Sequence, residues 1–172
     1  QITNIFPNLT VYENIRLASQ AMEKQKYNII RKAEALEQAE DRTQAVIKRV
    51  GLTAKATILA RNLPHGDQRK LELGMILAPD PAVLLLDEPT AGMASEQVPV
   101  LIELIQQIQE SGNKTVVLVE HNMNVVMRIS DRISVMHLGK VLAEGKPAEI
   151  AANEEVQTAY LGGLYELDIQ KT

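Results

Sequence analysis

Apolar and polar positions alternate with a helical period in the first part of the chain. Between residues 23 and 49, charged side chains surround a narrow apolar stripe, which predicts one or two amphipathic helices that end at Gly51. The stripe is formed by Ile29, Ala33, Leu36, Thr43, Ile47 and Val50. Closer to the start, Thr10 and Glu13 have the spacing of a capping box, so they predict the beginning of another helix.

A different pattern begins at residue 63. The loop Leu63–Asp67 opens a helix that ends at about Ala78, because the Pro-Asp-Pro segment after it cannot continue a helix. Residues Ala82–Leu86 are apolar at every position and lead into Asp87 and Glu88. Such a run is typical of a strand in a parallel sheet, where both faces are buried.

The second half of the chain continues the alternation of helices and strands. Ser95 is placed to cap a helix that runs through Gln109 and buries one apolar side. That side contains Val98, Leu101, Ile102, Leu104, Ile105 and Ile108. The elements expected next are a strand at Thr115–Glu120, a helix at Met123–Ile129, a strand at Arg132–Met136, and a turn at Gly139-Lys140 into Val141–Ala143. The pattern predicts an α/β layer with a parallel sheet that ends in a hairpin. A helical lobe precedes this layer, and short helices follow it from Pro147.

Composition excludes several classes of protein. The chain has 172 residues, 45% hydrophobic and 23% charged, which is typical of a soluble globular protein. A net charge of -4, 3% aromatic residues and no Trp argue against a nucleic-acid binder. The absence of Cys excludes disulfides, Cys-based zinc sites and a thiol nucleophile. Without a long apolar run or a secretory signal in the sequence, we expect a cytoplasmic setting.

The first candidate for chemistry is the acid pair that follows the apolar run at residues 82–86. Ligands of open α/β sheets gather at the carboxyl ends of the strands. Adjacent residues on a strand point in opposite directions, so Asp87 can hold a hydrated Mg²⁺ while Glu88 faces a water molecule. That division suits phosphoanhydride hydrolysis. The alternative is an ordinary strand that happens to end in two acids.

Two further features reach the same edge of the predicted sheet. His121 follows the second strand, where it becomes a candidate contact for a γ-phosphate, although a lone histidine is more often structural. The loop Leu63–Asp67 is a helix entrance with a row of free backbone N–H groups, which favours anions.

Taken together, these motifs resemble the nucleotide-binding subunit of an ATP-binding cassette (ABC) transporter, above all that of branched-chain amino-acid uptake systems. The residues that carry the resemblance are Gln1, Leu63–Arg69, Leu84–Thr90, Ala91–Met93, His121 and Ala159–Gly162. The resemblance covers essentially the whole chain. It implies the C-terminal part of an ABC ATPase, which is P-loop NTPase-like, with parallel strands, a helical subdomain and a terminal β-hairpin plus short helices.

The resemblance also implies roles for individual residues. Gln1 is similar to the Q-loop glutamine, which contacts Mg²⁺ and the attacking water. Asp87 matches the metal-binding Walker B aspartate, Glu88 the catalytic base, and His121 the catalytic H-loop histidine. The signature loop, which binds the γ-phosphate of ATP on a partner subunit, corresponds to Leu63, Pro64, His65, Gly66, Asp67 and Gln68. The D-loop corresponds to Ala91–Ala94, with Gly92 and Met93 as nucleotide-site residues.

The same resemblance divides the chain into three parts. Residues 1–80 correspond to the Q-loop and the helical signature subdomain, residues 81–146 to the α/β core with its motifs, and residues 147–172 to C-terminal helices and a tail. Three departures stand out: Pro64 replaces the signature serine, Ala94 replaces an acidic or amide D-loop residue, and no G-x-x-x-x-G-K-[ST] phosphate loop occurs.

We therefore expect a C-terminal portion of an ATP-hydrolysing importer subunit whose N-terminal nucleotide-binding piece has been removed. The parent would use ATP and Mg²⁺ to drive uptake of a small solute, with branched-chain or hydrophobic amino acids expected. Its partners would be transmembrane permease subunits, a second ATP-binding subunit as homo- or heterodimer, and indirectly a solute-binding protein, but no nucleic acid. It would lie on the inner face of the cell membrane. This chain alone is expected to bind and hydrolyse ATP poorly.

Two alternatives stay open. One is a non-catalytic interaction module that docks on a permease or on a partner ATPase. The other is a soluble ABC ATPase of DNA repair or translation, which is disfavoured because neither a basic surface nor a long coiled-coil pattern is visible in the sequence.

Overall fold

A computed structural model describes the backbone of residues 5–21, 29–111 and 114–161, and side chains in these ranges outside 29–36 and 161. The chain forms two compact units, residues 1–119 and 120–172. The predicted three-part division at residues 80 and 146 stays a prediction. Among the helices that the structure describes, none combines the length and apolar character needed to cross a membrane.

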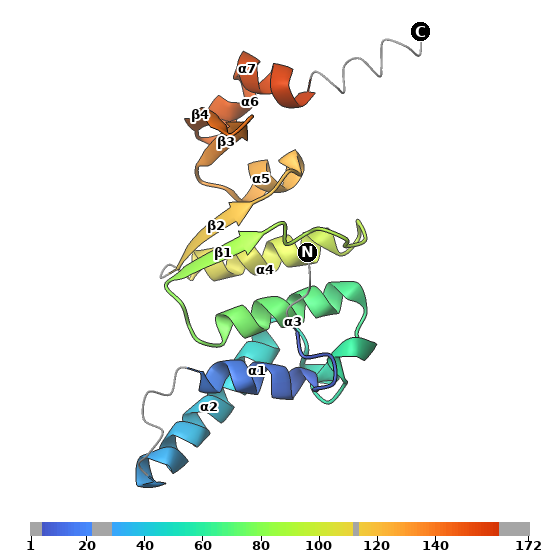
Figure 1. Ribbon diagram of the computed structural model, residues 1–172, viewed down its shortest axis with the longest axis vertical. Helices are drawn as coiled ribbons and strands as arrows, with labels where there is room; N and C mark the ends of the chain where they lie inside the picture. The colour runs from blue at the N-terminus through green and yellow to red at the C-terminus, as the bar shows by residue number, and fades with distance from the viewer. Residues whose placement is uncertain (1–4, 22–28, 112–113, 162–172) are drawn as a thin grey trace. The chain divides into compact units, whose positions relative to one another are not determined.

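The first unit combines a helical part with two parallel strands (Figure 1). Its helices and strands in chain order are α1 (Val11–Gln20), α2 (Ile29–Arg49), η1 (Thr53–Lys55), η2 (Ala60–Asn62), α3 (His65–Leu77), β1 (Val83–Asp87), α4 (Val98–Glu110) and β2 (Thr115–Val119). The second unit contains α5 (Met123–Ile129), β3 (Ile133–His137), β4 (Lys140–Gly145), α6 (Pro147–Ala151), α7 (Glu154–Val156) and η3 (Gln157–Leu161).

Two helix boundaries predicted in the first part are confirmed, the start at Thr10 and the end at Gly51, whereas the predicted beginning of the second helical segment at residue 23 lies outside the described residues. The Thr10 hydroxyl accepts a hydrogen bond of 3.1 Å from the Glu13 amide, and the Glu13 carboxylate accepts one of 2.8 Å from the Thr10 amide. Gly51 ends α2 with φ of 69°, a left-handed conformation that glycine adopts without steric cost. The predicted stripe positions Thr43, Ile47 and Val50 are buried, whereas the side chains of Ile29, Ala33 and Leu36 lie outside the described residues.

A buried asparagine fixes the chain where it enters α1. The Asn14 side chain is fully buried, accepts a hydrogen bond from the Phe6 amide at 2.8 Å and donates to the carbonyls of Phe6 and Thr10 at 3.1 and 2.8 Å. The neighbouring backbone is joined to the loop before α3, where the amide of Val11 donates to the carbonyl of Ile58 at 3.0 Å. The helical part is thus tied together by polar contacts as well as by apolar burial.

The two strands of the first unit are parallel, as predicted, but only one of their faces is buried. Leu84 and Leu86 are 1% and 6% exposed, whereas Leu85 is 72% exposed and Val83 is also exposed. The expectation of a strand buried on both faces is therefore wrong for the described residues. Successive side chains of a strand point to opposite faces, and the alternation of exposed and buried positions along β1 shows that the face bearing Leu85 is exposed.

Helix α4 begins later than the sequence predicts. Its N-cap is Gln97, which makes no capping hydrogen bond with its side chain, so the prediction of a Ser95 cap is wrong. Five of the six predicted apolar positions are buried and Val98 is half-buried. Pro99 lies in the first turn, where a missing N–H has no cost, and this favours the later start.

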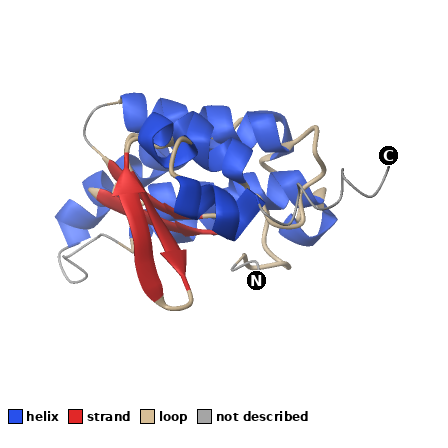
Figure 2. Ribbon diagram, turned by 90° about the horizontal axis from the view of Figure 1, so that it is seen from above, coloured by secondary structure: helices blue, strands red, loops and turns tan. Residues whose placement is uncertain are grey.

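In the second unit, β3 and β4 form an antiparallel hairpin (Figure 2). Leu138 and Gly139 connect the strands, and their φ values of 49° and 77° fit the two-residue turns that such hairpins favour. The predicted hairpin is confirmed. The expectation that the third strand joins the parallel sheet is wrong for the described strands, among which β3 pairs with β4 alone. The short turn accounts for the β3–β4 pairing, since it places β4 directly beside β3.

Candidate functional site

The acid pair stands at the carboxyl end of β1, with the backbone of its second member in a left-handed conformation. Asp87 is the last, exposed residue of the strand, and Glu88 follows it with φ of 43°. The Glu88 amide donates a hydrogen bond of 2.8 Å to the carbonyl of Val119 at the end of β2. The Glu88 carbonyl accepts one of 3.0 Å from the amide of Ala91. These two bonds hold a conformation that is costly for a residue with a side chain, as is typical of functional sites.

The helix entrance at Leu63–Gln68 offers fewer backbone donors than the sequence suggests. Pro64 has no N–H, and its carbonyl accepts the amides of Asp67 and Gln68 at 2.9 and 3.0 Å. The expected row of free N–H groups is therefore reduced to His65 and Gly66, which stand at the first two positions of α3 ahead of any acceptor within the helix. The Gln68 side chain donates to the carbonyl of Leu63 at 2.9 Å and closes the loop.

Two lysines neutralise the acid in the first turn of α3. Asp67 forms ion pairs with Lys55 of η1 and, at 3.3 Å, with Lys70. Burial raises the pKa of Asp67, but the hydrogen bonds and charges of Lys55 and Lys70 outweigh it, so the pKa of this carboxyl lies below its ordinary value. The carboxylate is charged at neutral pH and compensated, so it does not oppose an anion at the helix entrance as strongly as an isolated aspartate would.

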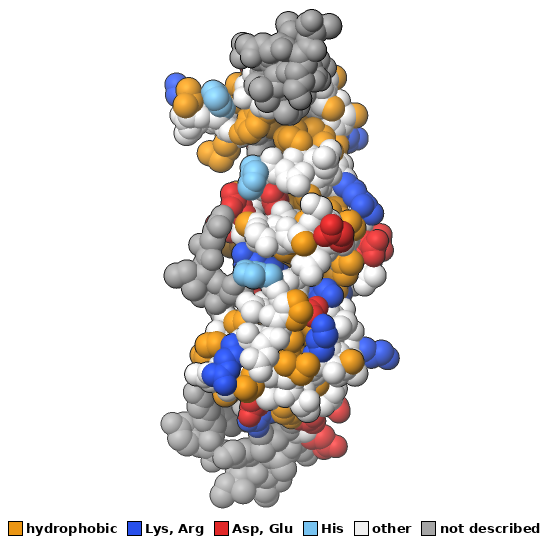
Figure 3. Space-filling model, turned by 90° about the vertical axis from the view of Figure 1, so that its right-hand side faces the viewer, with side chains coloured by type: hydrophobic (Ala, Val, Ile, Leu, Met, Phe, Trp, Pro, Cys, Tyr) orange, Lys and Arg blue, Asp and Glu red, His pale blue; other side chains and the backbone are white. Residues whose placement is uncertain are grey.

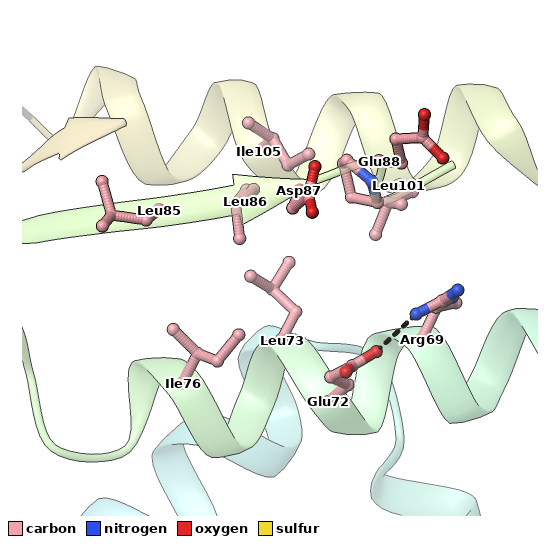
Figure 4. Close-up of a pocket in the computed structure, with 11 residues that line it drawn as sticks. Arg69, Glu72, Leu73, Ile76, Leu85, Leu86, Asp87, Glu88, Leu101 and Ile105 are labelled. Carbon is pink, nitrogen blue, oxygen red and sulfur yellow. Dashed lines mark hydrogen bonds and ion pairs between the residues drawn. The ribbon is translucent and has the colours of Figure 1, made fainter. Parts of the chain in front are cut away.

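A cavity of about 480 Å³ joins α3 to the acid pair (Figure 4). Its polar end contains Arg69, Glu72, Asp87 and Glu88, and Arg69 forms an ion pair of 2.8 Å with Glu72. Its apolar wall is formed by Leu73, Ile76, Leu85, Leu86, Pro89, Leu101 and Ile105. The structure thus brings α3, which begins within the predicted signature loop, next to the predicted metal ligand Asp87 and the predicted catalytic base Glu88.

The remaining predicted site residues occupy different places. Gly92, with φ of 73°, and Met93 lie in the turn after the acid pair, where the Met93 amide donates to the Thr90 carbonyl at 3.2 Å. His121 belongs to the second unit, and its side chain is exposed. The backbone amide of His121 donates a hydrogen bond of 3.1 Å to the Glu120 carboxylate. Its role beside Glu88 stays a prediction. Gln1 lies outside the described residues.

Two residues near the site were given no functional role by the sequence-based predictions. Arg69 reaches the carbonyl of Ala91 in the turn after the acids, at 3.4 Å. The end of the Gln97 side chain lies so close to Gly66 that a side chain at residue 66 would require Gln97 to move. Arg69 ends the Leu63–Arg69 run that carries the family resemblance, so the sequence holds a signal for it, but nothing in the local pattern around Gln97 indicates its contact with Gly66.

Comparison with known proteins decides the family. A family model described as "ABC transporter" matches residues 1–91, and one described as "Branched-chain amino acid ATP-binding cassette transporter" matches residues 140–165. The chain belongs to the ABC transporter family. The α/β cassette fold expected from the motifs is also confirmed by solved structures. One is a dimeric post-hydrolysis state of the ATP-binding cassette MJ0796 bound to ADP and Pi, with a TM-score of 0.69 and 27% identity over 86% of this chain and 60% of that chain.

Further relatives show how much of an ABC subunit this chain represents. It is 39% identical over 167 residues to the high-affinity branched-chain amino acid transport ATP-binding protein LivG of Salmonella typhimurium. That match covers 94% of this chain and 66% of the relative. The structure of cbiO1 from Clostridium perfringens, part of the ABC transporter complex cbiONQ, has a TM-score of 0.74 at 24% identity, covers 95% of this chain and 62% of that chain, and supports the fold. The chain therefore spans about two thirds of the length of the proteins it matches.

Proposed function

We propose that this chain supplies the acid pair, the signature loop and the D-loop of the ATP-hydrolysing subunit of an ABC importer. The observation that carries the proposal is the backbone of Glu88, held in a left-handed conformation between Val119 and Ala91 beside an exposed Asp87. In this assignment residues 1–80 form the Q-loop and helical subdomain, residues 81–146 the motif-bearing core, and residues 147–172 the C-terminal part.

The donor set fits a magnesium ion that is bound together with nucleotide. Among the described residues, no group of three or more His, Asp or Glu could hold a metal by itself. Mg²⁺ is usually held by one or two carboxylates plus substrate phosphates, so a single exposed Asp87 at a strand end is a suitable ligand, with Gln1 as the second. When bound, Mg²⁺ neutralises charge that develops on the transferred phosphoryl group.

The protein groups then divide the work of hydrolysis. Glu88 orients the attacking water and accepts its proton, and its fixed backbone limits the directions in which the carboxylate can point. His121 contacts the γ-phosphate. The amides of His65 and Gly66, at the start of α3, bind the γ-phosphate of a nucleotide held by a second ATP-binding subunit. Gly92 and Met93 belong to the turn that follows the catalytic carboxylate.

The relatives and the exposed surface support a proposal for the transported solute and the partners. The name of the LivG relative refers to branched-chain amino acid transport, so we assign these amino acids as the solute. Large apolar side chains of the helical part are exposed at Phe6, Leu17 and Ile58, and they support docking on a membrane permease. On the face in Figure 3, acidic and basic side chains are interspersed. The assembled subunit would lie in the cytoplasm, peripheral to the membrane.

The test uses the complete product of the reading frame that contains this sequence, with phosphate release from MgATP as the readout. Glu88→Gln is expected to lower kcat about 10²- to 10⁴-fold while nucleotide binding is retained. Arg132→Lys, at an exposed ion pair of the second unit, is the control and should not change kcat. An unmodified protein without Mg²⁺-dependent hydrolysis, or a Glu88→Gln variant of normal activity, would contradict the proposal and favour a non-catalytic module.

A further inference from the structure

Arg69 links the helix after the signature loop to the turn after the acid pair. Its side chain is 13% exposed, and Nη2 donates to the carbonyl of Ala91 at 3.4 Å. The Glu72 carboxylate holds Nη1 at 2.8 Å and so sets the direction of the guanidinium plane. The third nitrogen, Nε, is buried and has no hydrogen-bond partner among the described residues. The contacts with Glu72 and Ala91 together fix the orientation of the guanidinium group, which lines the same cavity as Glu88.

A second contact joins the same two segments independently of Arg69. The Gln97 side chain occupies the space beside Gly66 where a Cβ would stand. Gly66 lies in the signature loop, and Gln97 ends the segment that begins at Ala91. The loop and this segment therefore touch at two points, one through a side chain of α3 and one through a side chain that precedes α4.

Ala91 connects these contacts to the catalytic carboxylate. Its carbonyl accepts the bond from Arg69, and its amide donates a bond of 3.0 Å to the carbonyl of Glu88. The two peptide groups that flank the Cα of Ala91 are thus both engaged, one with α3 through Arg69 and the other with Glu88. At 3.4 Å the Arg69 bond is longer than the ordinary N–H···O range, so it leaves room for α3 and the turn to approach each other more closely.

We propose that Arg69 is a positioning residue for Glu88, acting through Ala91, and that Gln97 reinforces the same connection through Gly66. Displacement of the signature loop by a nucleotide on the partner subunit then shifts the turn that fixes the catalytic base of this subunit. The inference rests on the proposed function for the identity of the reaction. The connection between α3 and residue 91 rests only on the contacts described above.

The first experiment measures ATP hydrolysis by the complete reading-frame product. Arg69→Lys keeps the charge but loses the planar fork that contacts Glu72 and Ala91 together, so kcat is expected to fall about tenfold with KM changed less than about twofold. In a Glu88→Gln background the same substitution should change the residual rate little, because the group that it positions is absent. An equal loss in both backgrounds would show a merely structural role and overturn the inference.

The control and the second readout keep this test separate from that of the proposed function. Arg61→Lys alters an exposed arginine of the same unit, bonded to Asn8 at 2.9 Å, and should leave kcat unchanged. Hydrogen exchange at the Ala91 amide requires no activity. Faster exchange in Arg69→Lys but not in Arg61→Lys supports the connection even if the unmodified protein hydrolyses no ATP, an outcome that defeats only the proposed function. Unchanged exchange at residue 91 overturns the inference.

Discussion

The amide of Glu88 lies 2.8 Å from the carbonyl of Val119, and this bond joins the ends of two parallel strands at the residue where the chain turns left-handed. Each strand end thereby fixes the other. The backbone of Glu88 is consequently held in place by β2, a neighbouring strand that lies far away in the sequence. The position of the acid depends on β2 and on the turn to Ala91 as much as on its own strand.

The left-handed backbone of residue 88 has a measurable effect on stability. A residue with a Cβ is disfavoured at φ of 43°, and glycine is not. We expect Glu88→Gly to have a free energy of unfolding about 1 kcal/mol higher than that of Glu88→Ala, after the larger chain entropy of unfolded glycine is taken into account. Denaturant unfolding of both variants measures the difference. Gly92→Ala, at φ of 73° with open space around it, should lose about 1 kcal/mol, and equal stabilities of the two residue-88 variants would argue against backbone strain.

The contact of Gly66 with Gln97 predicts a coupling between two substitutions. Gly66→Ala adds a methyl group in the space that the Gln97 side chain fills, so Gln97 must rotate away. In a Gln97→Ala background that space is open, and the same change should stabilise the first turn of α3 by up to about 1 kcal/mol because alanine is the better helix former. A double-mutant cycle from thermal unfolding should give a coupling of about 0.5–1 kcal/mol. Additive effects would show that the two residues do not meet.

The ion pairs of Asp67 predict a dependence of stability on pH. Burial raises the pKa of Asp67, but the hydrogen bonds and charges of Lys55 and Lys70 lower it by more than burial raises it. The Asp67 carboxylate of the folded protein therefore binds a proton less tightly than that of the unfolded chain. The contribution of Asp67 is therefore fully present above the ordinary carboxyl pKa of about 3.9 and is lost as the pH falls through the lower pKa of the folded state.

This dependence is tested by chemical unfolding of Asp67→Asn between neutral pH and pH values below the ordinary carboxyl range. The unmodified protein should be more stable than the variant near neutral pH, and the difference should shrink as the pH falls. Lys55→Met should show a smaller change in the same direction, about 1 kcal/mol or less, since Lys55 is 40% exposed. A difference that grows towards acid pH would contradict the sign of the effect.

Lys114 and Asp80 form a pair whose two members should respond differently to substitution. The Lys114 side chain is 5% exposed and donates to the Asp80 carboxylate at 2.5 Å and to the Pro81 carbonyl at 2.9 Å. Lys114→Met should lower the free energy of unfolding by about 1–3 kcal/mol, because the Pro81 carbonyl loses its partner at the start of β1. Asp80→Asn should cost less than about 0.5 kcal/mol, since Asp80 is 73% exposed and asparagine tolerates its φ of 50°. Thermal unfolding of the two variants measures this asymmetry, and equal losses would contradict it.

The local elements of this protein follow from short-range sequence signals. The capping box of Thr10 and Glu13 and the terminating Gly51 act within one or two turns of the chain, so their effects can be predicted without knowledge of distant residues. The hairpin around Gly139 is encoded in the same way. The order of the motifs also indicated the family, because a site that binds and hydrolyses a nucleotide needs carboxylates and a histidine at strand ends and backbone amides at the start of a helix.

Contacts between distant segments could not be predicted in this way. Exposure of Leu85 depends on which elements cover each face of β1, and the late start of α4 at Val98 overrides the propensity of Ser95 to cap. The path from Arg69 through Ala91 to Glu88 exists because folding brings α3 next to the end of β1. Sequence alone determined which chemical groups this protein carries and the local elements that bear them. Tertiary structure decided which groups meet, because hydrogen bonds and close packing act over a few ångströms in space, whatever the distance along the chain.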